Sequence, residues 1–341
     1  MISLPILDLD NTQRVKEYEE FVKNSPHGHL MQSTNWIKVK EGWESDYVYL
    51  TDENDQINAA LSILSVKNDG EHAFMYAPRG PVCDLHDTEL VDRLIKEAKP
   101  IAEKHKAFLL RIDSETLYDG DLVEAYRSLG YTFRSREQED EHVFSNPRFH
   151  MMVDLIDHDA ESLLMEFTSN NRRKIRKTYK SELVTNIITA EDEEYEAALD
   201  RFYELTKVMA EREGISHRPQ KYFDNLMHAF DDAKIYETYH EDDLLSTAIV
   251  VTYNKKSFYM YAASSNVKRN MNGSLQTNYE AIKYSISQGI AEYDMGGVFG
   301  FDESDGLYRF KKIFTGEEGL KEFIGELDVV YDQEMYEDFI K

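Results

Sequence analysis

The 341-residue sequence predicts an α/β protein with mixed sheets, built from two tandem domains of the same topology. The length supports two domains, because one domain holds about 100–200 residues. The composition supports packed cores, since 41% of the residues are hydrophobic and 12% are aromatic. The third observation is a similar order of strand and helix patterns in the two halves of the chain.

The first half of the chain alternates strand and helix patterns. Apolar residues spaced by three or four indicate helices, and runs rich in Val, Ile, Tyr and Phe indicate strands. The acidic turn 52–55 between the first two strands is typical of a hairpin, and Gly130 is placed to end the last helix. The expected segments are a helix over 15–23, strands over 47–51, 57–66 and 74–77, a helix over 87–106 interrupted at Pro100, a strand over 108–112 and a helix over 120–129.

The second half shows a related order. Gly214 is placed to end a long helix, and polar turns at 241–243 and 254–256 separate three strands. The expected segments are helices over 193–213 and 220–230, strands over 234–239, 244–253 and 257–263, a helix over 275–288 and a strand over 292–295. Matching strands of the two halves are about 185 residues apart, which indicates a duplication.

This order of elements is that of the GCN5-related N-acetyltransferase (GNAT) fold, so two GNAT-like domains in tandem are predicted. GNAT enzymes bind the diphosphate of coenzyme A at a Gln/Arg-x-x-Gly-x-Gly/Ala loop, where backbone amides face the anion. The corresponding segments, 78–84 and 264–273, hold one glycine each. We therefore expect an acyl donor other than acetyl-CoA.

The charge distribution has one exceptional segment. The net charge of −26 argues against DNA as a partner, because phosphate contacts need positive potential. Residues 168–181, however, contain six basic residues and no acid, and 191–200 contain six acids. The basic run is either a solvated helix face or a landing site for a polyanion, and composition leaves both interpretations open.

Other features point to a cytoplasmic location. Cys83 is the single cysteine, which excludes a disulfide framework. No apolar run approaches 18 residues, and the first ten residues lack the basic start of a signal peptide. A cytoplasmic monomer without a transmembrane segment is the expectation. The sequence also shows no spacing typical of metal ligands, so no metal site is predicted.

Seven short motifs carry a family resemblance that runs through nearly the whole chain in order. They are Trp36-Ile-Lys38, Ser169-Asn-Asn-Arg-Arg-Lys-Ile-Arg-Lys177, Gly214-Ile-Ser-His-Arg-Pro219, Tyr259-Met-Tyr261, Tyr293-Asp-Met-Gly-Gly297, Leu307-Tyr-Arg-Phe-Lys-Lys312 and Phe323-Ile-Gly-Glu326. Each motif is weak alone, but the ordered set resembles the Fem-type (FemABX) aminoacyltransferases of peptidoglycan bridge synthesis. The chain is most similar to the short, alanine-adding members, because it lacks the heptads of a coiled-coil arm.

The resemblance implies an enzyme that transfers an amino acid from aminoacyl-tRNA to the stem-peptide lysine of UDP-MurNAc-pentapeptide. Alanine is the expected amino acid, with serine and glycine as alternatives, and no cofactor is implied beyond the tRNA co-substrate. The implied domains are 1–149 with 321–341, on the acceptor side, and 150–320, on the tRNA side. Alternatives are a related transferase that uses lipid II or another acyl donor, and a non-catalytic tRNA- or nucleotide-binding protein.

The resemblance also implies binding residues for the nucleotide. Lys38, after Trp36, and Arg218 correspond to ligands of the UDP diphosphate, and a guanidinium suits that geometry well. Tyr222 is expected on the same side of a helix as Arg218. Tyr259 and Tyr261 are expected on one face of a strand, where they could line a substrate cleft.

The catalytic and tRNA-binding residues are implied in the same way. Asp113 ends a buried strand and is a candidate base, although it could serve only to position the acceptor amine. Lys311 corresponds to the cation beside the tRNA 3′ end and the developing oxyanion, with Phe310 flanking the channel. The tRNA-binding residues expected in addition to Lys311 are Arg172, Arg173, Lys174, Arg176 and Lys177.

Overall fold

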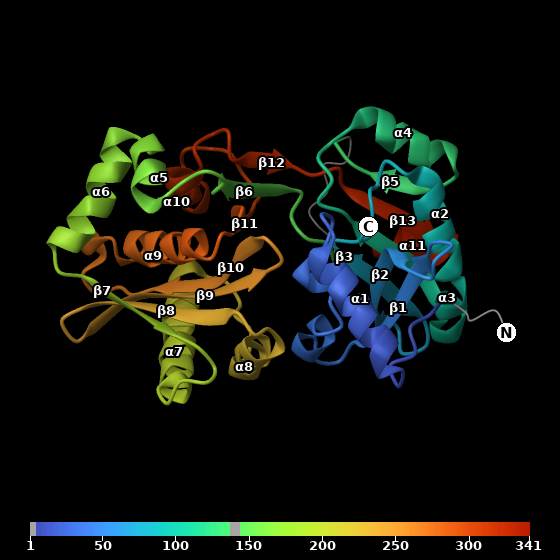
Figure 1. Ribbon diagram of the computed structural model, residues 1–341, viewed down its shortest axis with the longest axis horizontal. Coiled ribbons are helices and arrows are strands. Elements are labelled where there is room, and N and C mark those ends of the chain that lie inside the picture. The colour runs from blue at the N-terminus through green and yellow to red at the C-terminus, as the bar shows by residue number, and fades with distance from the viewer. Residues whose placement is uncertain (1–4, 137–143) are drawn as a thin grey trace. The chain divides into compact units, whose positions relative to one another are not determined.

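The computed structural model describes residues 5–136 and 144–341, and the chain divides into two compact units (Figure 1). The first unit consists of Met1–Arg148 and Glu322–Lys341, and the second of Phe149–Lys321. These boundaries lie within one residue of the expected ones. No helix among the described residues has the length and apolar character needed to cross a bilayer.

The first unit is built on a six-stranded sheet of order β1-β2-β3-β4-β13-β5. Its strands are β1 (Glu44–Thr51), β2 (Ile57–Lys67), β3 (Ala73–Pro78), β4 (Ala107–Asp113), β5 (Thr132–Arg134) and β13 (Glu326–Val330). Its helices are α1 (Thr12–Asn24), α2 (Thr88–Glu97), α3 (Lys99–His105), α4 (Gly120–Ser128) and α11 (Gln333–Phe339), with 3₁₀ turns η1 (Leu30–Gln32) and η2 (Trp36–Val39). Because β13 lies between β4 and β5, the C-terminal segment completes this sheet, as the family resemblance implies.

The second unit is built on a seven-stranded sheet of order β12-β6-β11-β10-β9-β8-β7. Its strands are β6 (Phe149–Asp154), β7 (Val184–Ile188), β8 (Ala233–His240), β9 (Asp243–Tyr253), β10 (Lys256–Ser264), β11 (Glu292–Val298) and β12 (Leu320–Glu322), whose last residue belongs to the first unit. Its helices are α5 (Ala160–Glu166), α6 (Ser169–Lys180), α7 (Tyr195–Glu213), α8 (Gln220–Ala229), α9 (Gly273–Ser287) and α10 (Gly306–Thr315), with a 3₁₀ turn η3 (Arg269–Met271).

The two sheets repeat one pairing pattern. In the first, β1, β2 and β3 are antiparallel neighbours, β3 and β4 are parallel, and β4 is antiparallel to β13. In the second, β8, β9 and β10 are antiparallel, β10 and β11 are parallel, and β11 is antiparallel to β6. The duplication predicted from the sequence is therefore present. The two units differ in the strand next to β4 or β11, because β13 comes from the end of the chain and β6 from the start of the second unit.

Helices cover both faces of the second sheet. Figure 1 shows α9 on one face of the sheet and α7 with α8 on the other. Alternation along β8 gives the reason: Thr238 bonds to Thr277 of α9, whereas Glu237 is bound by Arg201 of α7. The contacts of α9 with the sheet are partly polar, since Ser285 donates to Ser257. The apolar core between α5, α9, α10 and the sheet includes Met151, Ile282 and Tyr293.

Most expected elements are present, with shifts at their ends. The expected helix over 87–106 is two helices, α2 and α3, and Pro100 lies in the first turn of α3, where a missing N–H costs no helical hydrogen bond. Sequence patterns did not predict the short strands β5, β7, β12 and β13, strand β6, or helices α5, α10 and α11.

The C-terminal segment is joined to the first unit by a buried ion pair. Arg111 Nε and Nη2 donate to Asp328 Oδ1 and Oδ2 at 2.8 and 2.7 Å, and Tyr336 Oη donates to Asp328 Oδ2 at 2.9 Å. Both charged side chains are at most 1% exposed. Because β4 supplies Arg111 and β13 supplies Asp328, the pair connects strands that are distant in the sequence.

We predict that Asp328→Ala destabilises the protein by about 3–5 kcal/mol, because it leaves the Arg111 guanidinium buried without its carboxylate. Urea unfolding of the variant and wild type measures the loss. Asp338→Ala is the control on the same segment, since Asp338 forms an exposed ion pair with Lys341 and its removal should barely move the unfolding midpoint. Equal midpoints for all three proteins contradict the prediction.

Candidate active site

The parallel strands β10 and β11 separate after three paired residues. Their pairing runs from Lys256–Glu292 to Phe258–Asp294 and then stops. An irregularity follows in each strand, between Tyr259 and Tyr261 in β10 and between Asp294 and Gly297 in β11. The separation opens the sheet at its centre and leaves backbone groups of both strands beyond Phe258 and Asp294 unpaired with each other.

Lys311 of α10 lies at this separation. Its Nζ donates to the Gly297 carbonyl oxygen at 2.7 Å, and the side chain is buried, with 5% of the residue exposed. Gly296 adopts φ +82°, and a Cβ there would lie 3.4 Å from Lys311 Nζ and 3.9 Å from the Tyr259 carbonyl oxygen. The absence of a side chain at Gly296 therefore lets the backbone approach the ammonium closely.

The electrostatics of Lys311 are unusual for a lysine. Burial lowers its pKa to about 8, and the carboxylates of Asp294 and Asp305 offset part of that effect. A cation held in a low-dielectric site interacts strongly with any negative charge that develops beside it. The family motif around Lys311 does not indicate that this lysine is buried.

The equivalent place in the first unit is closed. Strands β3 and β4 stay paired to their ends, up to Pro78–Asp113. The Asp113 carboxylate accepts hydrogen bonds from Tyr76 Oη, from the Arg79 N–H at 2.7 Å, and from the backbone N–H and side-chain amide of Asn146 at 2.8 and 3.1 Å. Asp113 is 3% exposed, and burial raises its pKa against the opposing effects of Arg79 and these donors. Its oxygens are thus occupied by donors from three other residues of the first unit.

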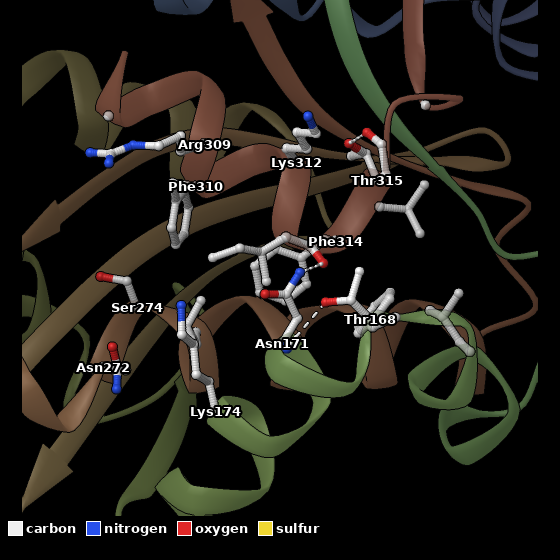
Figure 2. A pocket seen from close by; sticks show the side chains of 18 of the residues that line it. Thr168, Asn171, Lys174, Asn272, Ser274, Arg309, Phe310, Lys312, Phe314 and Thr315 are labelled. Atoms are coloured by element: carbon white, nitrogen blue, oxygen red, sulfur yellow. Dashed lines mark hydrogen bonds between the residues drawn. The ribbon is translucent and has the colours of Figure 1, made fainter. Parts of the chain in front are cut away.

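A cavity of about 1130 Å³ lies in the second unit (Figure 2). It is lined by α6, by the loop after β10, by the first turn of α9, by one side of α10 and by the turn after α10. Phe310 lines the cavity, whereas Lys311 does not. Helix α10 thus presents Phe310 to the cavity and the neighbouring Lys311 to β11.

One end of the cavity is basic. Lys174, Arg269 and Arg309 line it, and none of the three forms an ion pair within the described residues. Figure 2 shows Lys174, Asn272 and Ser274 near Phe310 and Arg309. Helix α9 begins here, and its N-cap residue Asn272 makes no capping hydrogen bond with its side chain. The first amides of a helix and its dipole favour an anion at such a place.

The opposite end of the cavity contains Glu303, Glu317 and Glu318, near Lys312 and Thr315. Lys312 Nζ donates to Glu303 and Glu317, both at 2.7 Å, so its charge is neutralised by this cluster. The cavity therefore has a basic end, with Lys174, Arg269 and Arg309, and an acidic end, with Glu303, Glu317 and Glu318.

The basic run forms α6, and its cations differ in their partners. Arg172 donates to the carbonyl oxygens of Met165 and Phe167, and Arg176 is bound to Glu161. The others, Arg173, Lys174, Lys177 and Lys180, form no ion pair in the described part of the chain. The expected polyanion-binding set therefore divides into two arginines that hold the helix in place and residues whose charge is available.

The expected nucleotide-binding residues belong to both units. In the first, Trp36 is 2% exposed and packs in the core, while the exposed Lys38 directs its Nζ to Asn35 Oδ1 at 2.6 Å. In the second, the Arg218 guanidinium lies over the Tyr222 ring at 5.4 Å, and Tyr261 Oη donates to Tyr222 Oη at 2.9 Å. Arg218, Tyr222 and Tyr261 thus form one cluster.

Two geometric expectations were wrong. Arg218 does not share a helix with Tyr222, because α8 begins after Pro219, whose extended backbone (ψ 154°) precedes the first turn. Tyr259 and Tyr261 do not share a face, because the irregularity in β10 lies between them. Tyr259 packs with the core on the α9 side, and Tyr261 packs on Phe223 of α8 at 5.1 Å between ring centroids.

The structure adds residues that sequence reasoning missed. Arg269 and Arg309 line the cavity from two elements that are far apart in the sequence. The only sequence signal for them is that Arg269 lies close to Asn272-Gly273 and Arg309 is adjacent to Phe310. The buried pair of His150 and Asp294 lies beside Lys311, with His150 Nδ1 2.9 Å from Asp294 Oδ2. Asp294 belongs to the motif that ends in Gly297, whereas His150 carried no sequence signal.

A sequence model described as the FemAB family matches residues 14–236 and 233–339. The chain belongs to the FemAB family. It is 35% identical over 348 residues to the UDP-N-acetylmuramoylpentapeptide-lysine N(6)-alanyltransferase of Weissella viridescens, with 99% of this chain and 100% of that protein covered.

Solved structures agree on the fold of this FemAB protein. The crystal structure of FemX superposes with a TM-score of 0.83 at 24% identity, covering 98% of this chain and 100% of FemX. A tandem GNAT protein from the clavulanic acid biosynthesis pathway gives a TM-score of 0.55 at 12% identity, covering 95% and 97%. The fold is thus a tandem GNAT-like one, and α7, with 19 residues, is the longest described helix, so no described segment resembles a coiled-coil arm.

We predict that Lys311 lowers the stability of the FemAB protein in a pH-dependent way. The folded pKa of about 8 lies below the unfolded value near 10.4, so the unfolded state binds more protons and wild-type stability rises above pH 8. Lys311→Met removes this dependence. Relative to the variant, wild type should gain about 2 kcal/mol between pH 7 and pH 9.5 in urea unfolding.

Lys312→Met provides the control, since Lys312 is ion-paired to Glu303 and Glu317 and its pKa is raised. Its difference from wild type should show no such gain over this pH range. A pH-independent difference between Lys311→Met and wild type contradicts the assignment of a buried ammonium.

Proposed function

We propose that this FemAB protein transfers an aminoacyl group from aminoacyl-tRNA to the lysine Nε of UDP-MurNAc-pentapeptide. The observation that carries the proposal is the buried cation Lys311 at the separation of β10 and β11, beside a cavity with a basic end. The full-length similarity to an alanyltransferase that acts on this lysine supports alanine as the transferred group and the soluble nucleotide as the acceptor.

The reaction needs charge stabilisation more than activation. The ester of aminoacyl-tRNA is already reactive, so the neutral acceptor amine attacks its carbonyl carbon directly. A C–N bond forms, the C–O bond to the ribose breaks, the amine loses a proton and the ribose oxygen gains one. The carbonyl oxygen is negatively charged in between, and the Lys311 ammonium is the group that stabilises it in this proposal.

The tRNA 3′ end is the ligand that suits the cavity. Its phosphates are anions, and Lys174, Arg269, Arg309 and the start of α9 offer positive potential at one end. Its bases can stack on aromatic rings, and Phe310 lies on the cavity wall. Phe310 is the neighbour of Lys311 in α10, so a 3′ end held against Phe310 binds the helix that carries Lys311.

The test is transfer of labelled alanine from alanyl-tRNA to UDP-MurNAc-pentapeptide, with the product located by tandem mass spectrometry. We expect alanine on the lysine Nε, and no transfer by Lys311→Met. Seryl- and glycyl-tRNA test the donor, and lipid II tests the acceptor. Absence of transfer to either acceptor from all three donors contradicts the proposal and favours a binding protein.

The acceptor side rests on the cations that the family resemblance assigns to the diphosphate. We predict that Lys38→Ala and Arg218→Ala each raise the KM for the nucleotide by about 10-fold or more, because a charge-assisted hydrogen bond is lost. Thermal unfolding should barely change, since Lys38 and Arg218 are exposed. Lys16→Ala, at an exposed lysine of the first unit, is the control and should leave the KM for the nucleotide unchanged. If the two variants bind the nucleotide as wild type does, Lys38 and Arg218 are not its ligands.

The donor side rests on the available cations of α6. We predict that the double variant Arg173→Ala/Lys177→Ala weakens aminoacyl-tRNA binding and flattens its salt dependence. Each phosphate contact contributes about 0.7 to the slope of log affinity against log salt for single strands, so the slope should fall by roughly 1.4. Fluorescence anisotropy from about 50 to 200 mM salt measures it.

Arg176→Ala is the matched control, because Arg176 lies on the same helix but is bound to Glu161. Its slope should stay close to that of wild type, and nucleotide binding should survive in all three proteins. Equal slopes for the double variant and wild type contradict the prediction. In that case Arg173 and Lys177 belong to a solvated face of α6, and RNA binds only at the cavity.

A further inference from the structure

A buried carboxylate beside Lys311 has no part in the reaction proposed above. Asp294 of β11 is 3% exposed. Its Oδ1 accepts the Gly296 N–H at 2.7 Å, and His150 Nδ1 of β6 lies 2.9 Å from its Oδ2 and 3.1 Å from its Oδ1. His150 is itself 8% exposed, so both members of the pair are removed from solvent. Burying a carboxylate without function or partner is costly, and here the partner is a hydrogen-bonded imidazole.

The pair is linked to Lys311 through two residues, Gly296 and Gly297. The Gly296 N–H donates to Asp294, and the carbonyl oxygen of the following residue, Gly297, accepts a hydrogen bond from Lys311 Nζ at 2.7 Å. Gly296 has φ +82°, a backbone conformation that glycine adopts without steric cost but with much conformational freedom. The hydrogen bond to Asp294 restricts that freedom, so the position of the Gly297 carbonyl, and with it that of the ammonium, depends on Asp294.

The pair also sets the charge around the ammonium. Burial raises the pKa of Asp294, but His150, Lys256 and the Gly296 N–H together hold it below its ordinary value, so the side chain is a carboxylate. Its negative charge and that of Asp305, at the start of α10, face Lys311 and favour the protonated amine. Tyr259 and Tyr293 flank the same place, and burial raises the pKa of each phenol, so both are neutral.

We propose that Asp294, oriented by His150, is a positioning residue that fixes Lys311 at the strand separation and keeps it a cation for acyl transfer. The inference rests on the proposed function, and it deepens that function by assigning a role to a pair of residues outside the substrate contacts. A plain structural ion pair is the competing explanation. It predicts a loss of stability and no specific change at Lys311.

The experiment is an NMR titration of protein labelled with ¹³Cε-lysine, in which Lys311 is assigned by its absence in Lys311→Met. In wild type the Lys311 signal should titrate near pH 8. In Asp294→Asn the midpoint should fall by ~1 pH unit, because the opposite charge of the Asp294 carboxylate, which favours the protonated Lys311, is gone. His150→Asn keeps a donor near the Nδ1 position and should leave the midpoint close to that of wild type.

Kinetics provide the second readout. Asp294→Asn should lower kcat by ~10-fold or more, with an unchanged KM for the nucleotide, because stabilisation of the transition state is lost rather than binding. As the pH is raised, the activity of Asp294→Asn should also begin to decline at a lower pH than that of wild type, because Lys311 of the variant loses its proton at a lower pH. Asp294→Glu keeps the charge but displaces the carboxylate from the Gly296 N–H, so its Lys311 midpoint stays while kcat falls.

Glu237→Gln is the matched control. Glu237 is a fully buried carboxylate of β8 in the same unit, bound by Arg201 at 2.9 and 2.8 Å. The variant should lose stability and leave the titration of Lys311 unchanged. An unchanged Lys311 midpoint and an unchanged kcat in Asp294→Asn overturn the inference.

If Asp294→Asn does not fold, Asp294→Glu carries the test, and wild-type kcat in that variant overturns the positioning role. The titration needs no substrate. A wild type that transfers nothing therefore contradicts the proposed function, while the link between Asp294 and Lys311 is still measured.

Discussion

The Lys311 ammonium is held inside the second unit by one backbone carbonyl, and the local architecture is arranged around that contact. Strands β10 and β11 stop pairing after Phe258 and Asp294, which creates the space, and Gly296 leaves room for the amine. The adjacent residues Phe310 and Lys311 of α10 point to different places: Phe310 lines the cavity, and Lys311 contacts Gly297 of β11. A buried lysine costs folding free energy, and such a cost is typical of a functional site.

The two units show how one topology supports different roles. Both sheets repeat the same antiparallel and parallel pairings, yet only β10 and β11 separate, whereas β3 and β4 remain paired up to Asp113. In the first unit the strand ends are closed by the bonds that Asp113 accepts from Arg79 and Asn146. Chemistry at the centre of the sheet is therefore expected in the second unit.

The sequence was sufficient for the fold and for part of the site. Periodicity and the repeated order of elements predicted the tandem architecture, because long amphipathic helices and apolar strands dominate both halves. Short edge strands such as β7 carry too few residues for a pattern. The burial of Lys311, the pairing of His150 with Asp294 and the loss of alternation between Tyr259 and Tyr261 all depend on contacts or irregularities that local sequence does not encode.

The most direct measurement is a crystal structure of the protein bound to a short RNA that ends in CCA and carries alanine through a non-hydrolysable 3′-amide. The RNA phosphates are expected at the basic end of the cavity, near Lys174, Arg269 and Arg309, and the alanyl carbonyl oxygen within hydrogen-bond distance of Lys311 Nζ. An RNA end bound away from the cavity, or a carbonyl oxygen remote from Lys311, would contradict the assignment of Lys311 as the stabilising cation.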